Sequence, residues 1–292
     1  MEAKLYKKLQ GGKVKCGLCN HRCLISHNKM GICGVRLNKN GKLYSLIYGR
    51  PISVHIDPIE KKPLYHFMSK TDTLSFGTFG CNFRCDWCQN WEISQTNKSD
   101  LSVIEKISLK VSPKEMVARA KKENCPSISY TYTEPTIFFE YALNTMKLAH
   151  KAGFKNIWVS NGYFTKKAFR QFEPYLDAIN IDLKGFSNRN YLKYCGARLR
   201  PVLNNLKRIK KVKHIHLEIT TLIITGVNDD EKQLKQIADF IASLDKNIPW
   251  HLSRFFPCYK MTDTPPTPIS TLKKAQKIGQ KTGLKYVYLG NI

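Results

Sequence analysis

Short apolar runs alternate with longer segments of helical periodicity from Thr73 to the end of the chain. The apolar runs cover residues 73–79, 127–133, 156–162, 177–185, 214–226, 249–257 and 285–291. The longer segments cover residues 112–124, 136–153, 165–176, 200–212, 229–244 and 268–283. Strands that alternate with helices of ten or more residues indicate β-α units and a parallel sheet. The pattern therefore predicts an α/β fold, either an open doubly wound sheet or a partial barrel.

Local signals mark where several of these helices begin and end. Ser112 and Pro113 suit the N-cap and the first position of one helix, and Gly153 suits the end of the next. Asp229 and Asp230 place negative charge at the start of another. In both candidate folds the chemistry gathers at the carboxyl ends of strands, so we expect site residues directly after the apolar runs.

Residues 1–70 have a different pattern. They contain short apolar segments such as residues 42–49, the turn sequence NKNGK at residues 38–42, and a group of four cysteines. We therefore expect a small cysteine-containing extension at residues 1–70 and a core domain at residues 71–292. A chain of 292 residues, of which 42% are hydrophobic, is long enough to form that core.

The sequence has no apolar run near the roughly 18 residues that a membrane-spanning helix needs. Residues 1–17 also lack the apolar segment of a signal peptide. These features predict a cytoplasmic protein with no membrane partner. Its ten cysteines are then expected to be free thiols or metal ligands rather than disulfides.

The net charge is +26, from 48 lysines and arginines against 22 acidic residues. Such a charge is typical of nucleic-acid-binding proteins. The lysines are scattered, however, with one denser run at residues 206–214, and no RNA-binding module with interleaved aromatics is evident. The pattern favours solvated basic faces over a nucleic-acid partner. A basic rim around a site for an acidic substrate or partner stays open.

Three cysteines follow the first predicted strand with the spacing C-x3-C-x2-C: Cys81, Cys85 and Cys88. Three thiolates at these spacings can close around one metal cluster. A zinc ion would need a fourth protein ligand, and the next cysteine along the chain is Cys125. An iron–sulfur cube with three protein ligands keeps one iron open for a substrate or cofactor.

This motif, with Trp87 before the last cysteine, resembles the radical SAM superfamily. The resemblance implies a [4Fe-4S] cluster on Cys81, Cys85 and Cys88, with S-adenosylmethionine (SAM) bound at the open iron. It implies reductive cleavage of SAM to a 5′-deoxyadenosyl radical, which abstracts hydrogen from a substrate, and an electron donor of ferredoxin or flavodoxin type. The implied fold is a partial (β/α)6 barrel. The resemblance identifies neither the substrate nor further catalytic residues.

Other strand ends carry further resemblances. Residues 130–136, YTYTEPT, resemble the Gly-Gly-Glu motif that holds the SAM amino group, with Glu134 at the carboxylate position. Tyr132 and Thr133 replace the glycines, which puts a close backbone approach in question. The segments VSNG and NIDLKG resemble pyruvate formate-lyase activating enzymes. This resemblance implies SAM contacts for Ser160 and Asn161 and for Asp182 and Lys184.

The N-terminal cysteines have the spacing C-x2-C-x3-C-x9-C: Cys16, Cys19, Cys23 and Cys33. This spacing suits structural zinc or a second iron–sulfur cluster, and a packed turn without metal is the third alternative. From about Lys15 to Asn291 the chain also resembles the radical SAM enzyme of the AmmeMemoRadiSam system, above all in DPIEKKPLYHF at residues 57–67. That resemblance implies Memo-like or AMMECR1-like partners.

The leading function is therefore a radical SAM enzyme with an unidentified substrate. One variant is an activase that generates a glycyl radical on a partner protein, and another modifies RNA. A non-enzymatic iron–sulfur electron-transfer or metal-binding protein is the alternative from a different class. Several polar residues just before the first strand are candidates for a substrate mouth: Asp57, Glu60, Lys61, Tyr65 and His66.

Overall fold

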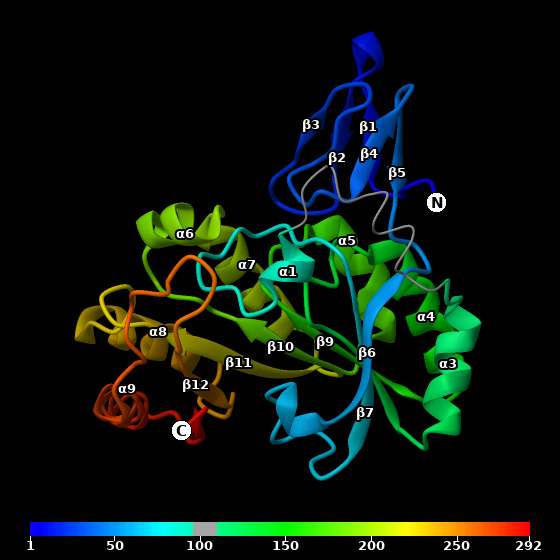
Figure 1. Cartoon of the computed structure of the whole chain (residues 1–292). Coiled ribbons are helices and arrows are strands. Elements are labelled where there is room, and N and C mark those ends of the chain that lie inside the picture. The colour runs from blue at the N-terminus through cyan, green and yellow to red at the C-terminus, as the bar shows by residue number, and fades with distance from the viewer. Residues whose placement is uncertain (96–109) are drawn as a thin grey trace.

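The computed structural model describes residues 1–95 and 110–292, and its centre is one eight-stranded sheet (Figure 1). Seven of the strands are parallel and lie in chain order: β7 (Asp72–Thr78), β8 (Ser127–Tyr130), β9 (Lys155–Ser160), β10 (Ala178–Asp182), β11 (His216–Ile223), β12 (Trp250–Arg254) and β13 (Val287–Gly290). The eighth, β6 (Pro51–Pro58), pairs with β7 in the antiparallel sense. The α/β prediction with a mostly parallel sheet is confirmed.

The parallel strands are apolar because the sheet is buried. All four residues of β8 and four of the five of β10 are buried, as expected for strands that helices cover. Each strand pairs with the next one along the chain, so all seven carboxyl ends lie at the same edge. In the described residues the outer strands β13 and β6 are not paired with each other, so the sheet stays open, as in a partial barrel.

The helices that connect the strands pack their buried faces onto the sheet: α3 (Pro113–Lys122), α4 (Phe139–Lys151), α5 (Lys166–Phe172), α7 (Leu199–Lys210), α8 (Glu231–Leu244) and α9 (Ile269–Lys281). Ser112 and Glu115 form a capping box at the start of α3, as the sequence predicted for its N-cap. Between helices and sheet, Trp158 of β9 stacks on Phe172 with ring centroids 4.0 Å apart. No helix in the described part of the chain has the length and apolar character needed to cross a membrane.

Among the described residues, two α-helices lie outside the predicted set. The first is the single-turn helix α1 (Trp91–Ser94), and the second is α6 (Asn188–Cys195), which Ser187 caps at its start and Gly196 ends with φ 63°. Both are too short to produce a clear apolar period. They matter because they flank the cysteine loop, as described below.

The main sheet reaches into residues 1–70, which were expected to form a separate extension. Strand β6, which the predicted extension included, is hydrogen-bonded to β7 in the main sheet. Within the described part of the chain, residues 1–50 stand apart from the sheet, at the top of Figure 1. They form β1 (Tyr6–Lys8), β2 (Val14–Cys16) and β3 (Leu24–Ile25), together with a hairpin of β4 (Arg36–Lys39) and β5 (Lys42–Ser45). The alternating sequence pattern of β6 did not indicate that this strand belongs to the main sheet and not with the short strands of residues 1–50.

Candidate functional site

The three-cysteine loop leaves the carboxyl end of β7 and is held on several sides. Gly80 has φ +87°, and a side-chain carbon there would lie 2.6 Å from the carbonyl oxygen of Cys33. The Gly80 N–H donates to Ile93 of α1, which folds the loop back on itself. The backbone N–H of Arg84 and that of Asp86 donate to the carbonyls at the end of α6. The positions of Cys81, Cys85 and Cys88 are therefore fixed by short-range turns and by two helices.

The electrostatic surroundings of the three thiols differ. Burial, with the nearby Glu134 carboxylate, raises the pKa of Cys81. Burial also raises the pKa of Cys88, which lies 3.1 Å from the Ser94 hydroxyl. The pKa of Cys85 is lowered, chiefly by a hydrogen bond from the Cys195 thiol. The loop thus contains one thiol already inclined to ionise, and a bound metal would have to displace the protons of the other two.

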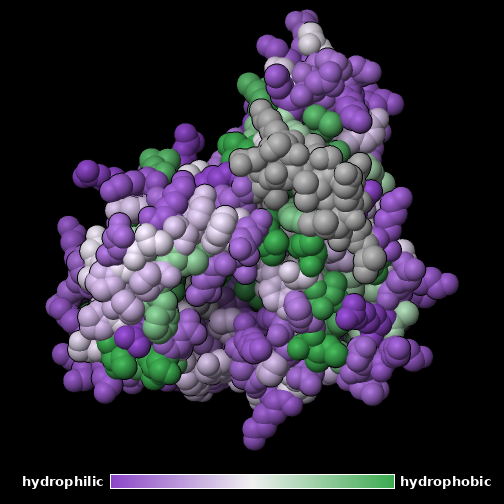
Figure 2. All heavy atoms as spheres, viewed as in Figure 1, coloured by the Kyte–Doolittle hydropathy of each residue, from purple (hydrophilic) through white to green (hydrophobic). Residues whose placement is uncertain are grey.

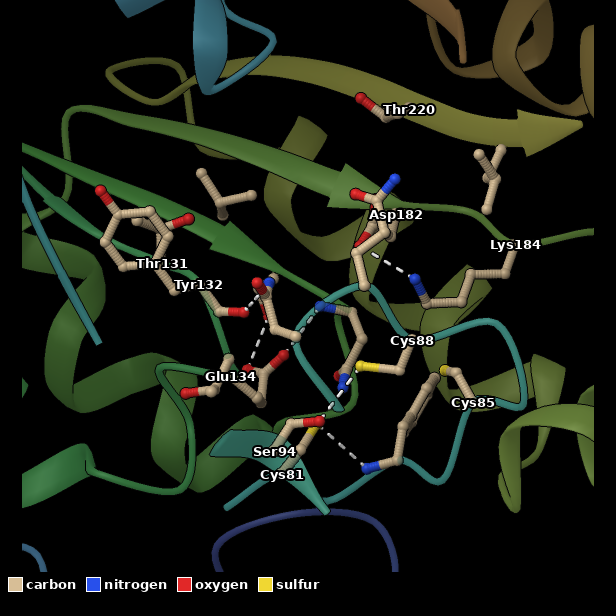
Figure 3. A pocket seen from close by; sticks show the side chains of 18 of the residues that line it. Cys81, Cys85, Cys88, Ser94, Thr131, Tyr132, Glu134, Asp182, Lys184 and Thr220 are labelled. Carbon is tan, nitrogen blue, oxygen red and sulfur yellow. Dashed lines mark hydrogen bonds and ion pairs between the residues drawn. The ribbon is translucent and has the colours of Figure 1, made fainter. Parts of the chain in front are cut away.

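All eight residues that the sequence predicted for the cluster and for SAM line one cavity of about 550 Å³. Figure 3 shows the cysteines on one side of this cavity, with Glu134 beside Cys81 and with Asp182 and Lys184 beyond Cys88. The cavity lies at the carboxyl edge of the sheet, and Figure 2 shows a hollow at the centre of this face of the molecule with hydrophilic residues around it. The predicted residues are: Cys81, Cys85, Cys88, Glu134, Ser160, Asn161, Asp182 and Lys184.

Glu134 is fully buried and already satisfied within the protein. Its carboxylate accepts hydrogen bonds from the N–H and hydroxyl of Thr136 (3.0 and 2.5 Å), the hydroxyl of Ser160 (2.9 Å) and the N–H of Asn161 (2.8 Å). Burial raises its pKa, and these hydrogen bonds partly oppose the rise. A carboxylate has about four lone-pair sites. Three of these hydrogen bonds reach Oε1 and one reaches Oε2, so Glu134 ties the end of β8 to the end of β9 while Oε2 keeps a lone pair for a further donor.

The side chains beyond the end of β10 form an ion pair, with Lys184 Nζ 3.0 Å from Asp182 Oδ2. Burial opposes the charge on Lys184, but Asp182 and the nearby cysteines together raise the pKa of Lys184. The lysine is therefore a cation in the cavity wall, close to the place where three thiolates would gather.

Tyr132 keeps the backbone conformation that its glycine counterpart would favour. Its φ is 65°, in the left-handed region that few non-glycine residues adopt. Its hydroxyl donates to Asp57 Oδ2 at 2.6 Å, and Lys62 pairs with the same oxygen at 2.6 Å. Although burial raises it, the pKa of Asp57 falls to about 2 because of Lys62 and Tyr132. These contacts hold the turn at Tyr132. The backbone there keeps the conformation that glycine favours, although tyrosine stands in place of the motif's glycine.

The candidates for a substrate mouth divide into two groups. Asp57 and Lys61 line the cavity, together with Lys62. Tyr65 and His66 lie elsewhere, where their backbone N–H groups donate to Glu218 at 3.1 and 2.8 Å. Glu60 does not line the cavity either, and it accepts a hydrogen bond from the N–H of Lys70.

Several residues at the site were not expected from the sequence. Thr220 and Leu222 of β11 line the cavity, and their two-residue spacing on a strand is the signal that could have paired them. Asn82 accepts a hydrogen bond from the Asn161 amide at 2.7 Å. The contact between Cys195 and Cys85 had no sequence signal, because the two residues are far apart in the chain.

The donor set fits an iron–sulfur cluster with an open iron. Within residues 1–95 and 110–292, no three His, Cys, Asp or Glu side chains converge closely enough to hold a single metal ion. A cubane distributes its protein ligands over separate irons, so its thiolates need not converge on one point. Three thiols on the wall of a cavity that has space for a further ligand suit that arrangement.

Comparison with known proteins gives a family match. Residues 76–241, more than half of the chain, match the Radical SAM superfamily. The Methanocaldococcus jannaschii protein MJ0808 is 44% identical over 292 residues, which cover 100% of this chain and 85% of MJ0808. MJ1632 from the same organism, named as a glycyl-radical enzyme activating enzyme, is 25% identical over 232 residues, covering 78% of this chain and 83% of MJ1632.

The fold has solved counterparts. The crystal structure of a radical SAM methyltransferase from Sphaerobacter thermophilus superposes with a TM-score of 0.59 at 13% identity, covering 99% of this chain and 76% of that chain. A likeness at this identity concerns the fold. It supports the α/β fold with a mostly parallel sheet.

Proposed function

The chain belongs to the radical SAM superfamily, and from this premise we propose that its cavity binds a [4Fe-4S] cluster and SAM in order to abstract hydrogen from a substrate. Membership implies an enzyme, whereas its particular reaction is part of the proposal. One observation carries it: the residues that resemble the superfamily's cluster and SAM motifs, which come from four strand ends, line a single cavity.

Each side of the cavity has its own role in this proposal. Cys81, Cys85 and Cys88 hold the cluster, which when bound supplies an open iron and the electron that cleaves SAM. Lys184 contributes a cation suited to a carboxylate, and its partner Asp182 offers an acceptor for a hydroxyl or an amine. Tyr132 and Thr133 line the cavity as well, and the Tyr132 carbonyl accepts a hydrogen bond from the Asn90 amide.

We assign Glu134 a positioning role in the same site. Two of its four accepted hydrogen bonds fix Ser160 and Asn161, which line the cavity, and the other two come from Thr136. The resemblance to the Gly-Gly-Glu motif instead implies a direct contact between Glu134 and the SAM amino group. Both roles require the carboxylate. If Glu134 acts by positioning its neighbours, a Glu134 variant also weakens the binding of a ligand without an amino group. If Glu134 contacts the amino group directly, binding of that ligand is unchanged.

The substrate side of the cavity is basic and polar. Lys61 and Lys62 line it from the segment after β6. Lys62 is 3% exposed, and its ammonium forms an ion pair with Asp57. Tyr132 joins the same cluster. This arrangement supports an acidic group on the substrate or on a partner protein. The electron donor, of ferredoxin or flavodoxin type, belongs to this proposal too, and so does cytoplasmic location.

The test is anaerobic reconstitution with iron and sulfide, followed by addition of SAM and dithionite. We expect 5′-deoxyadenosine to form, and we expect neither product nor the cavity's cluster signal in the Cys81→Ala, Cys85→Ala, Cys88→Ala variant. Cys125→Ala is the matched control, because Cys125 is buried elsewhere and should leave product formation unchanged. Product formation by the triple variant would contradict the assignment.

A second candidate function is glycyl-radical activation, which the name of MJ1632 favours. Its signature is a glycyl radical on a partner protein. EPR detects this radical after the reconstituted enzyme is mixed with SAM, reductant and that partner. The AmmeMemoRadiSam resemblance instead suggests Memo-like or AMMECR1-like proteins as partners, which a pull-down with the purified proteins tests. An electron-transfer protein without SAM chemistry is the third alternative, and 5′-deoxyadenosine formation would exclude it.

A further inference from the structure

The cysteine loop is covered on its outer side by two other segments, neither of which lines the SAM cavity. Helix α6 supplies the carbonyls of Tyr194 and Cys195, which accept from the backbone N–H groups of Asp86 and Arg84 at 3.0 and 2.9 Å. The connection from β12 to α9 meets the same loop, where the N–H of Lys260 donates to the Asp86 carbonyl at 3.0 Å. Figure 1 shows this connection in orange, on the same side of the loop as α6.

Helix α6 separates one of the predicted cluster ligands from solvent by the thickness of a single helix. Its inner face is buried: Tyr191 and Cys195 are each 1% exposed, and the Cys195 thiol hydrogen-bonds Cys85. Its outer face is open: Leu192 is 50% exposed, and Lys193 beside it is exposed too. Because the rate of electron transfer falls steeply with distance, a protein that docks on this outer face can pass an electron to a cluster on Cys85.

The stretch of chain that contains α6 is basic and has no carboxylate. Residues 183–217 carry lysines and arginines throughout but no Asp or Glu. Arg189 and Lys193 are exposed on α6, and neither forms an ion pair with any residue that the structure describes. The carboxylate of the cysteine loop itself, Asp86, lies 3.5 Å from Lys260 Nζ and is therefore already paired. The outer side of the loop thus presents cations that lack an acidic partner in the described part of the chain.

This arrangement has the features of a transient protein interface, in which an apolar centre is surrounded by polar or charged residues. Leu192 is the exposed apolar residue, Arg189 lies one helical turn before it, and Lys193 follows it. Redox partners commonly meet through small interfaces, and complementary charge steers them to the right face. A face of unpaired cations beside the cluster loop therefore fits an acidic protein that carries electrons.

We propose that Arg189, Leu192 and Lys193 of α6, together with Lys260, form the docking face for the electron donor, an acidic single-electron carrier protein. This inference rests on the proposed function, because a chain needs such a donor only if it holds the cluster. In the step itself the carrier's cofactor is oxidised by one electron and the cluster is reduced by one electron, and no bond forms or breaks. A single-stranded nucleic acid fits less well, because Leu192 is aliphatic and gives a base no ring to stack on.

Calorimetric titration of the reconstituted chain with purified flavodoxin, and separately with purified ferredoxin, tests the docking face without any turnover. We expect the Arg189→Glu, Lys193→Glu variant to bind these carriers roughly tenfold more weakly than wild type at low salt, and the difference to shrink at high salt. The matched control is Lys121→Glu, Lys122→Glu, which changes the net charge equally at two exposed lysines of α3. Figure 1 shows α3 on the opposite side of the molecule from α6, so this control should bind nearly as wild type does.

A kinetic measurement separates docking from the cluster itself. When reduced flavodoxin is the donor, the cluster of the α6 variant should be reduced roughly tenfold more slowly than that of the α3 control, as followed by loss of its visible absorbance. Dithionite needs no docking face, so with excess dithionite both variants should give the same EPR signal. Circular dichroism and iron content show whether each variant is folded and loaded. If charge reversal unfolds α6, Arg189→Gln, Lys193→Gln replaces it, with a smaller loss expected in the same direction.

Three results would overturn the docking face. Equal losses of affinity in the α6 variant and the α3 control would mean that only net charge matters. Failure of both carriers to bind wild type would leave the face without this partner. Tighter binding of a single-stranded RNA oligonucleotide, with the same dependence on α6, would assign the face to nucleic acid instead. The proposed function fails by a different result, the absence of 5′-deoxyadenosine when wild type is given SAM and dithionite.

Discussion

Glu134 illustrates how a residue at the centre of a site can act through its neighbours. Sequence alone assigned it to the ligand, whereas its carboxylate already accepts hydrogen bonds from Thr136, Ser160 and Asn161. A group in this position sets the geometry of a binding surface that other residues present. Its substitution should therefore disturb ligands of more than one kind.

We expect Glu134→Gln to weaken SAM binding about ten- to a hundredfold while the cluster stays intact, because a charged hydrogen bond is worth roughly 1.5–3 kcal/mol. The Gln amide would face donors from Ser160 and Asn161 that need an acceptor. Calorimetry measures the affinity, with the Glu123→Gln variant as an exposed control. An S-adenosyl sulfonium analogue without the amino group should lose affinity equally. If only SAM loses affinity and the analogue does not, Glu134 contacts the SAM amino group directly.

Cys195 is a second residue whose effect passes through another. Its thiol hydrogen-bonds Cys85, and burial and Cys85 together raise the pKa of Cys195 far above its ordinary value, so it remains a protonated donor. Hydrogen bonds to ligand sulfurs raise cluster potentials. We expect Cys195→Ala to keep its iron but to show a lower midpoint potential by EPR-monitored titration, and Cys195→Ser to restore it. Loss of iron in Cys195→Ala would make Cys195 a ligand.

At the scale of elements, the segment between β6 and β7 is one of those that shape the cavity. It carries Lys61 and Lys62 into the cavity, and its continuation is anchored by Glu218 in β11. Glu218 is fully buried and also accepts from His216 at 2.8 Å and from His251 at 2.5 Å. One side chain thus joins this segment to two parallel strands.

This anchor predicts a pH-dependent contribution to stability. Burial opposes ionisation, yet His216, His251 and the backbone donors lower the pKa of Glu218 to about 2. A depressed pKa stabilises the fold above the unfolded value of about 4.3 and loses that effect as pH falls towards 2. We expect Glu218→Gln to cost of the order of 3 kcal/mol at pH 7, with the difference shrinking below pH 4.

Urea unfolding of Glu218→Gln and wild type across pH 7 to 3 measures this effect. Glu173→Gln is the matched control, since Glu173 is only partly buried and faces the exposed His214 at 3.5 Å. That variant should differ little from wild type. A difference for Glu218→Gln that is independent of pH would mean that shape, not charge, holds the segment.

At the scale of the whole molecule, residues 1–50 are attached to the core by a buried ion pair as well as by backbone contacts. Arg36 of β4 lies 2.5 Å from Glu140 of α4, with exposures of 1% and 0%. The Lys4 N–H donates to the same carboxylate, and the Thr165 N–H donates to Leu18. Figure 1 shows how this region rises from the carboxyl edge of the sheet, above α4 and α5.

Breaking that pair should be costly, because it strands a buried charge. We expect Glu140→Gln to lower the free energy of unfolding by roughly 3–5 kcal/mol, measured by guanidinium denaturation. Asp239→Asn removes an exposed pair with Lys235 and should cost about 0.3–0.5 kcal/mol. Equal effects for the two variants would show that the attachment does not depend on the ion pair.

The sequence alone determined the features that are written locally. The alternation of apolar runs with helical segments predicted seven parallel strands, and the cysteine spacing predicted the loop after β7. Residues directly after strands β8, β9 and β10 were expected to meet, and they line one cavity because parallel strands end at a common edge. Periodicity and spacing depend on a few neighbouring residues, so they can be read without the fold.

Tertiary structure alone decided the contacts between distant segments. It placed β6 in the main sheet, Cys195 against Cys85, Tyr65 and His66 on Glu218, and Arg36 on Glu140. It also gave the carboxylate of Glu134 internal donors, Ser160 and Asn161, which its position in a motif did not reveal. Such contacts depend on how whole elements pack, and side chains far apart in the chain carry no local signal of their partners.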